Sequence, residues 1–170
     1  QLGDFLRDVF KRNDPVLIEV PVGPMPQMQT IEIAVGADDC LIGHLFPAEP
    51  ACRKGRSVIA GPATAVPQTF YYNFCRYLAG HGFDVLTFDF RSVGQSKLRP
   101  IRDYADIGFS SWAEQDYPAV IEWMHAQHPE QPLYIVGHSV GGWMPALTRA
   151  SNRIDGLLGI AALSAYWPLM

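Results

Sequence analysis

The stretch that decides the fold is Leu133-Tyr134-Ile135-Val136-Gly137-His138-Ser139-Val140-Gly141-Gly142. It begins with a short apolar run typical of a buried strand, and residues 140–150 have the pattern of a helix. Between them, Ser139 has a glycine two positions before it and another two positions after it. A strand-to-helix turn this sharp leaves room only for small residues, and it raises the serine oxygen above the sheet. The pattern therefore predicts a nucleophile elbow at Ser139; the alternative is a Gly-rich packing turn that happens to contain serine.

Strands and helices alternate on both sides of this turn. Apolar runs over 57–60, 85–88 and 157–163 predict strands, while 69–79 and 112–127 predict helices. Short apolar strands that alternate with helices indicate a parallel sheet covered by helices on both faces. An elbow at the carboxyl end of such a strand lies where open α/β sheets bind their ligands.

Two further details concern the first of these helices. It carries Phe70, Phe74, Tyr77 and Leu78 on one side, and Gly82 is expected to end it.

The chain before residue 57 follows a different pattern. Residues 29–35 alternate apolar and polar side chains, a Gly-Ala-Asp-Asp turn follows, and 41–46 form a second apolar run. This predicts an antiparallel hairpin. Farther upstream, apolar residues at helical spacing predict a short amphipathic helix over 2–11, followed by a proline-rich connector. We therefore expect a helix and connector over 1–28 and one α/β domain over 29–170.

Composition is typical of a globular protein. Of the 170 residues 48% are hydrophobic, and the net charge is −4 without a basic stripe, so we expect no nucleic-acid partner. No apolar run approaches the length of about 20 residues that spans a bilayer. Cys40, Cys52 and Cys75 are odd in number and lack metal-ligand spacing, so neither a disulfide framework nor a metal site is predicted. No cofactor is implied by the reaction predicted below. A reducing, cytoplasmic location fits best, and the oligomeric state stays open.

From Gln29 to its end the chain resembles the first two-thirds of an α/β-hydrolase. Residues 58–68, Val-Ile-Ala-Gly-Pro-Ala-Thr-Ala-Val-Pro-Gln, followed by Phe70-Tyr71, are similar to a bacterial subgroup of predicted serine hydrolases. Residues 89–96 resemble the family segment Asp-x-Arg-Gly-x-Gly-x-Ser, with Ser92 where glycine is usual. The resemblance implies an eight-stranded sheet of which the predicted strands are the first six. We therefore expect the natural chain to continue, because the sixth strand would otherwise be an apolar edge.

The resemblance also implies an oxyanion hole made of backbone N–H groups. Val140, which follows the elbow serine, would supply one donor. Thr64, with Ala65 as its neighbour, would supply the other from the loop after the third strand; the alternative is an ordinary turn of small residues. Tyr166 and Trp167 would line a substrate pocket, or else belong to the core.

A base for Ser139 is harder to assign. The family order is nucleophile, acid and then histidine, yet no histidine follows Ser139. Asp155 precedes a strand, which puts it at the sheet end opposite the elbow. We expect structural roles for Asp89, Arg91 and Asp116. Of the five histidines, His138 is expected to pack or hydrogen-bond locally, and surface or core positions are expected for His44, His81, His125 and His128. The catalytic acid and histidine are therefore expected beyond residue 170.

The resulting prediction is a serine hydrolase that transfers the acyl group of a small-molecule ester, thioester or amide to water. The 170-residue chain by itself is expected to be almost inactive, because it lacks the base. Two alternatives stay open. One is a non-catalytic α/β-hydrolase-like protein that binds a ligand or partner, and the other is an acyltransferase that uses an alcohol or thiol acceptor.

Overall fold

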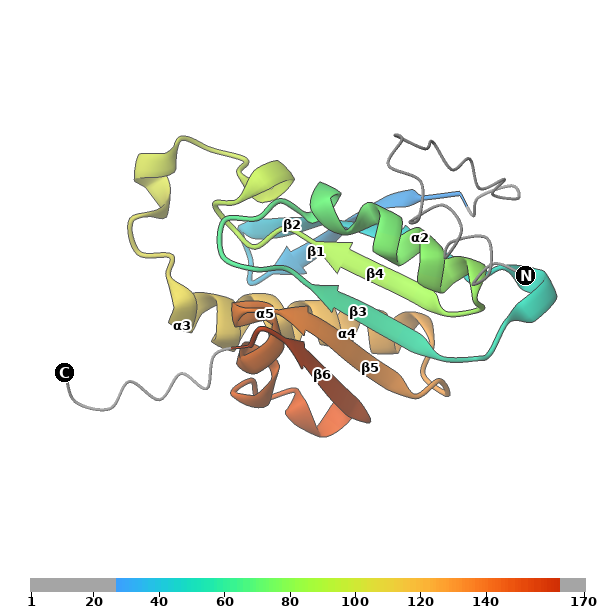
Figure 1. Cartoon of the computed structure of the whole chain (residues 1–170). Coiled ribbons are helices and arrows are strands. Elements are labelled where there is room, and N and C mark those ends of the chain that lie inside the picture. Colours follow the sequence, from blue (N-terminus) through green and yellow to red (C-terminus); the bar gives the residue numbers. More distant parts are fainter. Residues whose placement is uncertain (1–26, 163–170) are drawn as a thin grey trace, which may run out of the picture.

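One six-stranded sheet forms the centre of the computed structural model, which describes residues 27–162 (Figure 1). The strands are β1 (Gln29–Val35), β2 (Asp39–Phe46), β3 (Ser57–Gly61), β4 (Asp84–Phe88), β5 (Leu133–His138) and β6 (Gly156–Ile160). Their order across the sheet is β1-β2-β4-β3-β5-β6. β1 and β2 form an antiparallel hairpin, β2 pairs antiparallel with β4, and β4, β3, β5 and β6 are parallel. The predicted α/β fold class is confirmed.

Helices cover both faces of this sheet (Figure 1). They are α2 (Tyr72–Gly80), α3 (Phe109–Ser111), α4 (Tyr117–Gln127) and α5 (Val140–Trp143). A π-helical turn, η5 (Trp112–Asp116), joins α3 to α4, and short 3₁₀ helices complete the connections: η1 (Pro50–Cys52), η2 (Gln68–Tyr71), η3 (Gly94–Ser96), η4 (Ile101–Tyr104), η6 (Met144–Ala146) and η7 (Ser151–Arg153). The predicted amphipathic helix over 2–11 and nearly all of the connector lie outside the described residues. The division into segments 1–28 and 29–170 therefore stays a prediction.

The period of two along each strand separates the core into two layers. Ile59 packs in one cluster with α4, whereas its neighbours Val58 and Ala60 pack in the other cluster with α2. Successive side chains of a strand point to opposite faces, so the two clusters lie on opposite sides of the sheet. The sheet is thus buried on both faces at its centre, as a parallel sheet requires.

The helix predicted over 69–79 turns a different side to the sheet from the one its large residues suggest. Its buried residues, Tyr71, Cys75 and Ala79, follow each other at intervals of four, while Phe70 and Tyr77 are 71% and 61% exposed. Small side chains at the contact let the helix lie close to the sheet. The helix ends as predicted, since Gly82 has φ 90° and donates its N–H to the carbonyl of Ala79.

The helix predicted over 140–150 is wrong in length. The α-helical part, α5, ends at Trp143, and a 3₁₀ turn over Met144–Ala146 replaces its continuation. Pro145 is the cause, because it has no N–H to donate to the carbonyl of Gly141. That carbonyl instead accepts a hydrogen bond from the Tyr117 hydroxyl at 2.7 Å.

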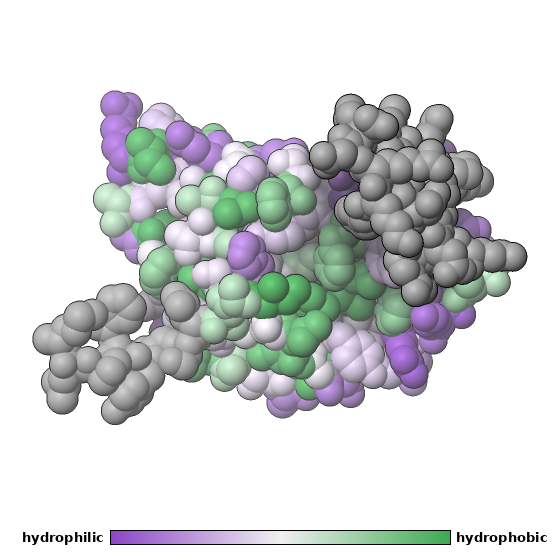
Figure 2. Space-filling view, viewed as in Figure 1, coloured by the Kyte–Doolittle hydropathy of each residue, from purple (hydrophilic) through white to green (hydrophobic). Residues whose placement is uncertain are grey.

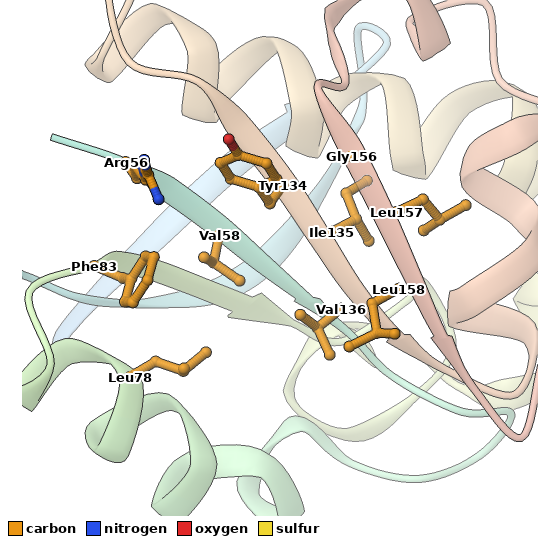
Figure 3. A pocket seen from close by; sticks show the side chains of 10 residues that line it. All are labelled: Arg56, Val58, Leu78, Phe83, Tyr134, Ile135, Val136, Gly156, Leu157 and Leu158. Atoms are coloured by element: carbon orange, nitrogen blue, oxygen red, sulfur yellow. The ribbon is translucent and has the colours of Figure 1, made fainter. Parts of the chain in front are cut away.

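β6 is the edge strand of the described sheet, and its side chains are open to solvent. Leu158 and Ile160 are 59% and 50% exposed. Figure 2 shows apolar surface gathered on this side of the molecule. A groove of about 420 Å³ opens there, lined by Val58, Val136 and Leu158 among others (Figure 3). The apolar edge expected from the sequence is therefore present in the fold.

Candidate active site

Ser139 occupies a strained turn between β5 and α5. Its backbone has φ 52° and ψ −118°, a conformation that costs a non-glycine residue about 1–3 kcal/mol. Two backbone hydrogen bonds hold it: Ser139 donates its N–H to the carbonyl of Ile160, and Gly142 donates to the carbonyl of Ser139, both at 2.9 Å. The chain therefore turns sharply at Ser139, where the sequence predicts a nucleophile elbow.

Glycine is required at three positions around this turn. A β-carbon on Gly137 would lie 1.9 Å from the carbonyl oxygen of Gly141. One on Gly141 would lie 2.4 Å from the carbonyl oxygen of Gly61, and one on Gly142 would lie 2.7 Å from that of Gly137. All of these neighbours are backbone atoms, which cannot move aside as a side chain does. The spacing noticed in the sequence thus reflects the close approach of three backbone segments.

The loop after β3 lies beside this turn. Gly61 pairs with Gly137 across the parallel strands, so the residues that follow each of them emerge at the same edge of the sheet. In this loop Thr64 is exposed and Ala65 adopts a left-handed φ of 57°. Val140 is the first residue of α5, and N–H groups in the first turn of a helix have no acceptor within the helix. The structure therefore brings the loop of Thr64 next to Ser139 and Val140.

Two tyrosines that were not among the predicted site residues, Tyr71 and Tyr117, hold the turn and the loop beside it. The Tyr117 hydroxyl donates to Gly141 as described above, and its fully buried ring packs against Phe88 and Phe90. The hydroxyl oxygen of Tyr71 accepts the N–H of Ala63 at 2.9 Å. Burial raises the pKa of both phenols, so both remain protonated and able to donate. No local sequence pattern distinguishes a tyrosine of the core from one that contacts the site. Only the fold shows that these two lie beside the turn.

The histidines other than His138 lie in core or surface positions, as expected, whereas His138 is hydrogen-bonded to a residue far along the chain instead of locally. His138 has its Nδ1 3.0 Å from the Tyr71 hydroxyl, and His44 is buried with its Nδ1 2.9 Å from the Tyr72 hydroxyl. His81 follows the end of α2, whereas His125 and His128 lie at the end of α4. Within residues 27–162, no histidine is hydrogen-bonded to the Ser139 side chain.

The loop after β4 is organised by buried charges, as expected for Asp89 and Arg91. The Asp89 carboxylate accepts the backbone N–H groups of Gln68 at 2.7 Å and Gln95 at 2.8 Å. Burial raises the pKa of Asp89, and these hydrogen bonds act in the opposite direction. Arg91 donates through its backbone N–H and its Nε to the buried carboxylate of Asp116, at 2.9 and 2.6 Å.

Other residues singled out in the sequence lie away from the turn or outside the described part. Asp155 accepts the N–H of Leu133 at 2.8 Å, at the sheet end opposite Ser139. Tyr166 and Trp167 lie outside the described residues. In the described part of the chain, no cluster of three or more His, Cys, Asp or Glu side chains could hold a metal ion. None of the helices over the same residues combines the length and the apolar character that a membrane span needs.

A mostly parallel sheet, begun by an antiparallel hairpin and carrying a serine on a strained turn after a parallel strand, defines the class of α/β-hydrolases. Within this class, the chain belongs to the serine hydrolase family described as serine aminopeptidase, S33, whose model matches residues 67–169, more than half of the chain.

Two curated proteins are similar in sequence to this chain over a shorter stretch. Over 79 residues, which are 46% of this chain, it is 29% identical to protein phosphatase methylesterase 1 of Bos taurus and of Homo sapiens. The match covers 20% and 19% of those two proteins, so the chain spans about a fifth of their length.

Solved structures with less than 25% identity have the same fold. One is an α/β serine hydrolase without lid from Xanthomonas campestris, with a TM-score of 0.64 at 23% identity over 88% of this chain and 67% of that chain. Another is a thermostable carboxyl esterase from Bacillus coagulans, with a TM-score of 0.57 at 18% identity over 72% of this chain and 39% of that chain.

Proposed function

We propose that the intact protein hydrolyses a carboxylic ester of a small molecule, with Ser139 as the nucleophile. The observation that carries this proposal is the strained backbone of Ser139, at φ 52° and ψ −118°, directly after a parallel strand. A fold retains such strain where the surrounding structure fixes it and where a function depends on it. The serine oxygen attacks the substrate carbonyl carbon, the alcohol leaves with a proton, and water then hydrolyses the acyl-enzyme.

The negative charge of the tetrahedral intermediate is stabilised by backbone donors in this mechanism. Val140 N–H, at the start of α5, and Thr64 N–H, in the loop after β3, are the two donors. Their pairing is supported by the parallel register of Gly61 with Gly137, which sets the two segments side by side. Donors fixed before the reaction stabilise developing charge without a cost of reorganisation.

The base that activates Ser139 is a histidine outside the 170 residues, oriented by an acid also located there. Support comes from the positions of the five histidines, all of which lie within the described residues and none of which is hydrogen-bonded to the Ser139 side chain.

An ester is the proposed substrate because the relatives with a named activity include a methylesterase and a carboxyl esterase. Thioester and amide substrates use the same chemistry and are the next candidates. No cofactor takes part. The three free cysteines support a reducing, cytoplasmic location.

A second candidate function is ligand or partner binding without catalysis. The same absence of a histidine bonded to Ser139 among residues 27–162 favours it. A fold of this class hosts both kinds of function, so the serine alone does not decide between them.

A fluorophosphonate probe on the full-length protein separates these two functions, because rapid phosphonylation requires an activated serine. We expect prompt labelling at Ser139 together with hydrolysis of a nitrophenyl ester, both abolished by Ser139→Ala. The control is Ser151→Ala, in the exposed 3₁₀ helix η7, which should retain both. A full-length protein that is folded but neither labelled nor active would favour the binding function.

A further inference from the structure

We infer that Tyr71 is a positioning residue that ties the proposed oxyanion loop to the turn of Ser139, a role that rests on the function proposed above. Its phenol oxygen has two partners, Ala63 N at 2.9 Å and His138 Nδ1 at 3.0 Å. Ala63 immediately precedes Thr64, and His138 immediately precedes Ser139. The phenol oxygen is thus hydrogen-bonded to the residue before Thr64 and to the residue before Ser139, the two residues that must converge on the substrate.

The two hydrogen bonds have compatible proton roles. Ala63 N–H is a donor, so the phenol oxygen accepts at that position. The phenol proton is then free to be donated to Nδ1 of a neutral His138 imidazole. Tyr71 is 8% exposed, so water competes little for either bond.

Few other contacts define the loop that Tyr71 holds. The strand pairing of β3 ends at Gly61, and within the loop the Val66 N–H donates to the carbonyl of Ala63 at 3.2 Å. Thr64 and Ala65 are exposed. The position of the Thr64 N–H relative to Ser139 therefore depends on the bond between Ala63 and Tyr71, and a displacement near 1 Å is enough to slow catalysis about a hundredfold.

The neighbouring tyrosine provides a matched control. Tyr72 is half-buried, and its hydroxyl is hydrogen-bonded to His44 on β2 instead of to the loop or the turn. Tyr71→Phe and Tyr72→Phe each remove one hydroxyl that bonds to a histidine. Only the first removes a contact to the proposed site.

The experiment measures ester hydrolysis and thermal unfolding of the full-length variants. In Tyr71→Phe we expect kcat to fall about tenfold or more with KM unchanged, because transition-state stabilisation is lost while substrate binding is kept. Tyr72→Phe should stay within about twofold of the wild type. The inference is overturned if Tyr71→Phe keeps its kcat, or if Tyr72→Phe loses as much.

Two variants of His138 keep the test decisive even if Tyr71→Phe fails to fold. The Asn side chain places an acceptor near the position of Nδ1, so His138→Asn should retain activity, whereas His138→Leu should lose about tenfold in kcat. Equal kcat in these two variants would overturn the inference. Failure of this inference is distinct from failure of the proposed function. Activity that survives Ser139→Ala would contradict the proposed function itself. An inactive Ser139→Ala variant together with a fully active Tyr71→Phe variant would contradict only the role of Tyr71.

Discussion

The carbonyl oxygen of Gly61 lies 2.4 Å from the position that a β-carbon on Gly141 would occupy. Gly61 ends β3 and Gly141 lies in the first turn of α5, so the helix after Ser139 rests directly on the backbone of the neighbouring strand. This contact sets how closely α5 approaches the end of β3. Any larger residue at either position would force the two apart.

Gly141→Ala should therefore destabilise the fold by about 3 kcal/mol or more, since the added methyl group meets backbone on the other side. Gly80→Ala is the matched control, because a β-carbon at Gly80, the last residue of α2, meets nothing within 4 Å. It should stabilise the protein by about 0.5 kcal/mol through the reduced entropy of the unfolded chain. Urea unfolding measures both changes. Equal midpoints for the two variants would contradict the proposed packing of α5.

Ser92→Gly should stabilise the protein by about 0.5–1 kcal/mol. Ser92 has a left-handed φ of 72°, a conformation that is costly for serine and free of strain for glycine. The opposite change nearby, Gly94→Ala, should destabilise, because φ is 47° there and a β-carbon would lie 2.3 Å from a carboxylate oxygen of Asp89. Thermal unfolding of the two variants tests the loop geometry, and a loss of stability in Ser92→Gly would show that this loop has another conformation.

Asp116→Ala should cost about 3–5 kcal/mol, because it leaves the charge of Arg91 buried with its main partner removed. The Asp116 carboxylate is fully buried and accepts the Nε–H of Arg91 at 2.6 Å. Asp103→Ala is the control, since its pair with Arg102, at 3.6 Å, is exposed and worth little. Chemical denaturation that found equal losses for the two variants would rule out a structural role for the buried pair.

Cysteine alkylation at pH 8 should proceed in the order Cys52, Cys40, Cys75. Cys52 is exposed, whereas burial raises the pKa of Cys40, with Glu32 and Asp39 acting in the same direction. Cys75 is fully buried between α2 and the sheet, and burial raises its pKa to about 12, so almost no thiolate forms at pH 8. Mass spectrometry after iodoacetamide treatment measures the order. In urea all three should react at similar rates, and early labelling of Cys75 in the native protein would contradict its burial.

Most of the fold could be predicted because its signals are local. The alternation of β1 and the apolar runs of β3, β4 and β5 each record the period or the burial of a strand. The helix predicted over 140–150 is too long for a local reason, the proline within it. Pro145 ended α5 early, and the carbonyl it left free is satisfied by Tyr117, a residue 24 positions away from Gly141. Around α2, Cys75 and Ala79 are buried whereas the large side chains of Phe70 and Tyr77 are exposed, and only the packing against the sheet decides which side is buried.

The sequence by itself determined the class of protein and the position of its candidate nucleophile. It could do so because the turn of Ser139 tolerates only glycine two positions before and two positions after the serine. This requirement can be recognised in a few consecutive residues of the sequence. Only the tertiary structure decided what holds the turn in place. Tyr71 and Tyr117 lie 68 and 22 positions before Ser139, and they reach its neighbourhood because the sheet sets β3 beside β5 with α2 and α4 on opposite faces. A hydrogen bond between residues so far apart depends on the path of the whole chain, which no short pattern records.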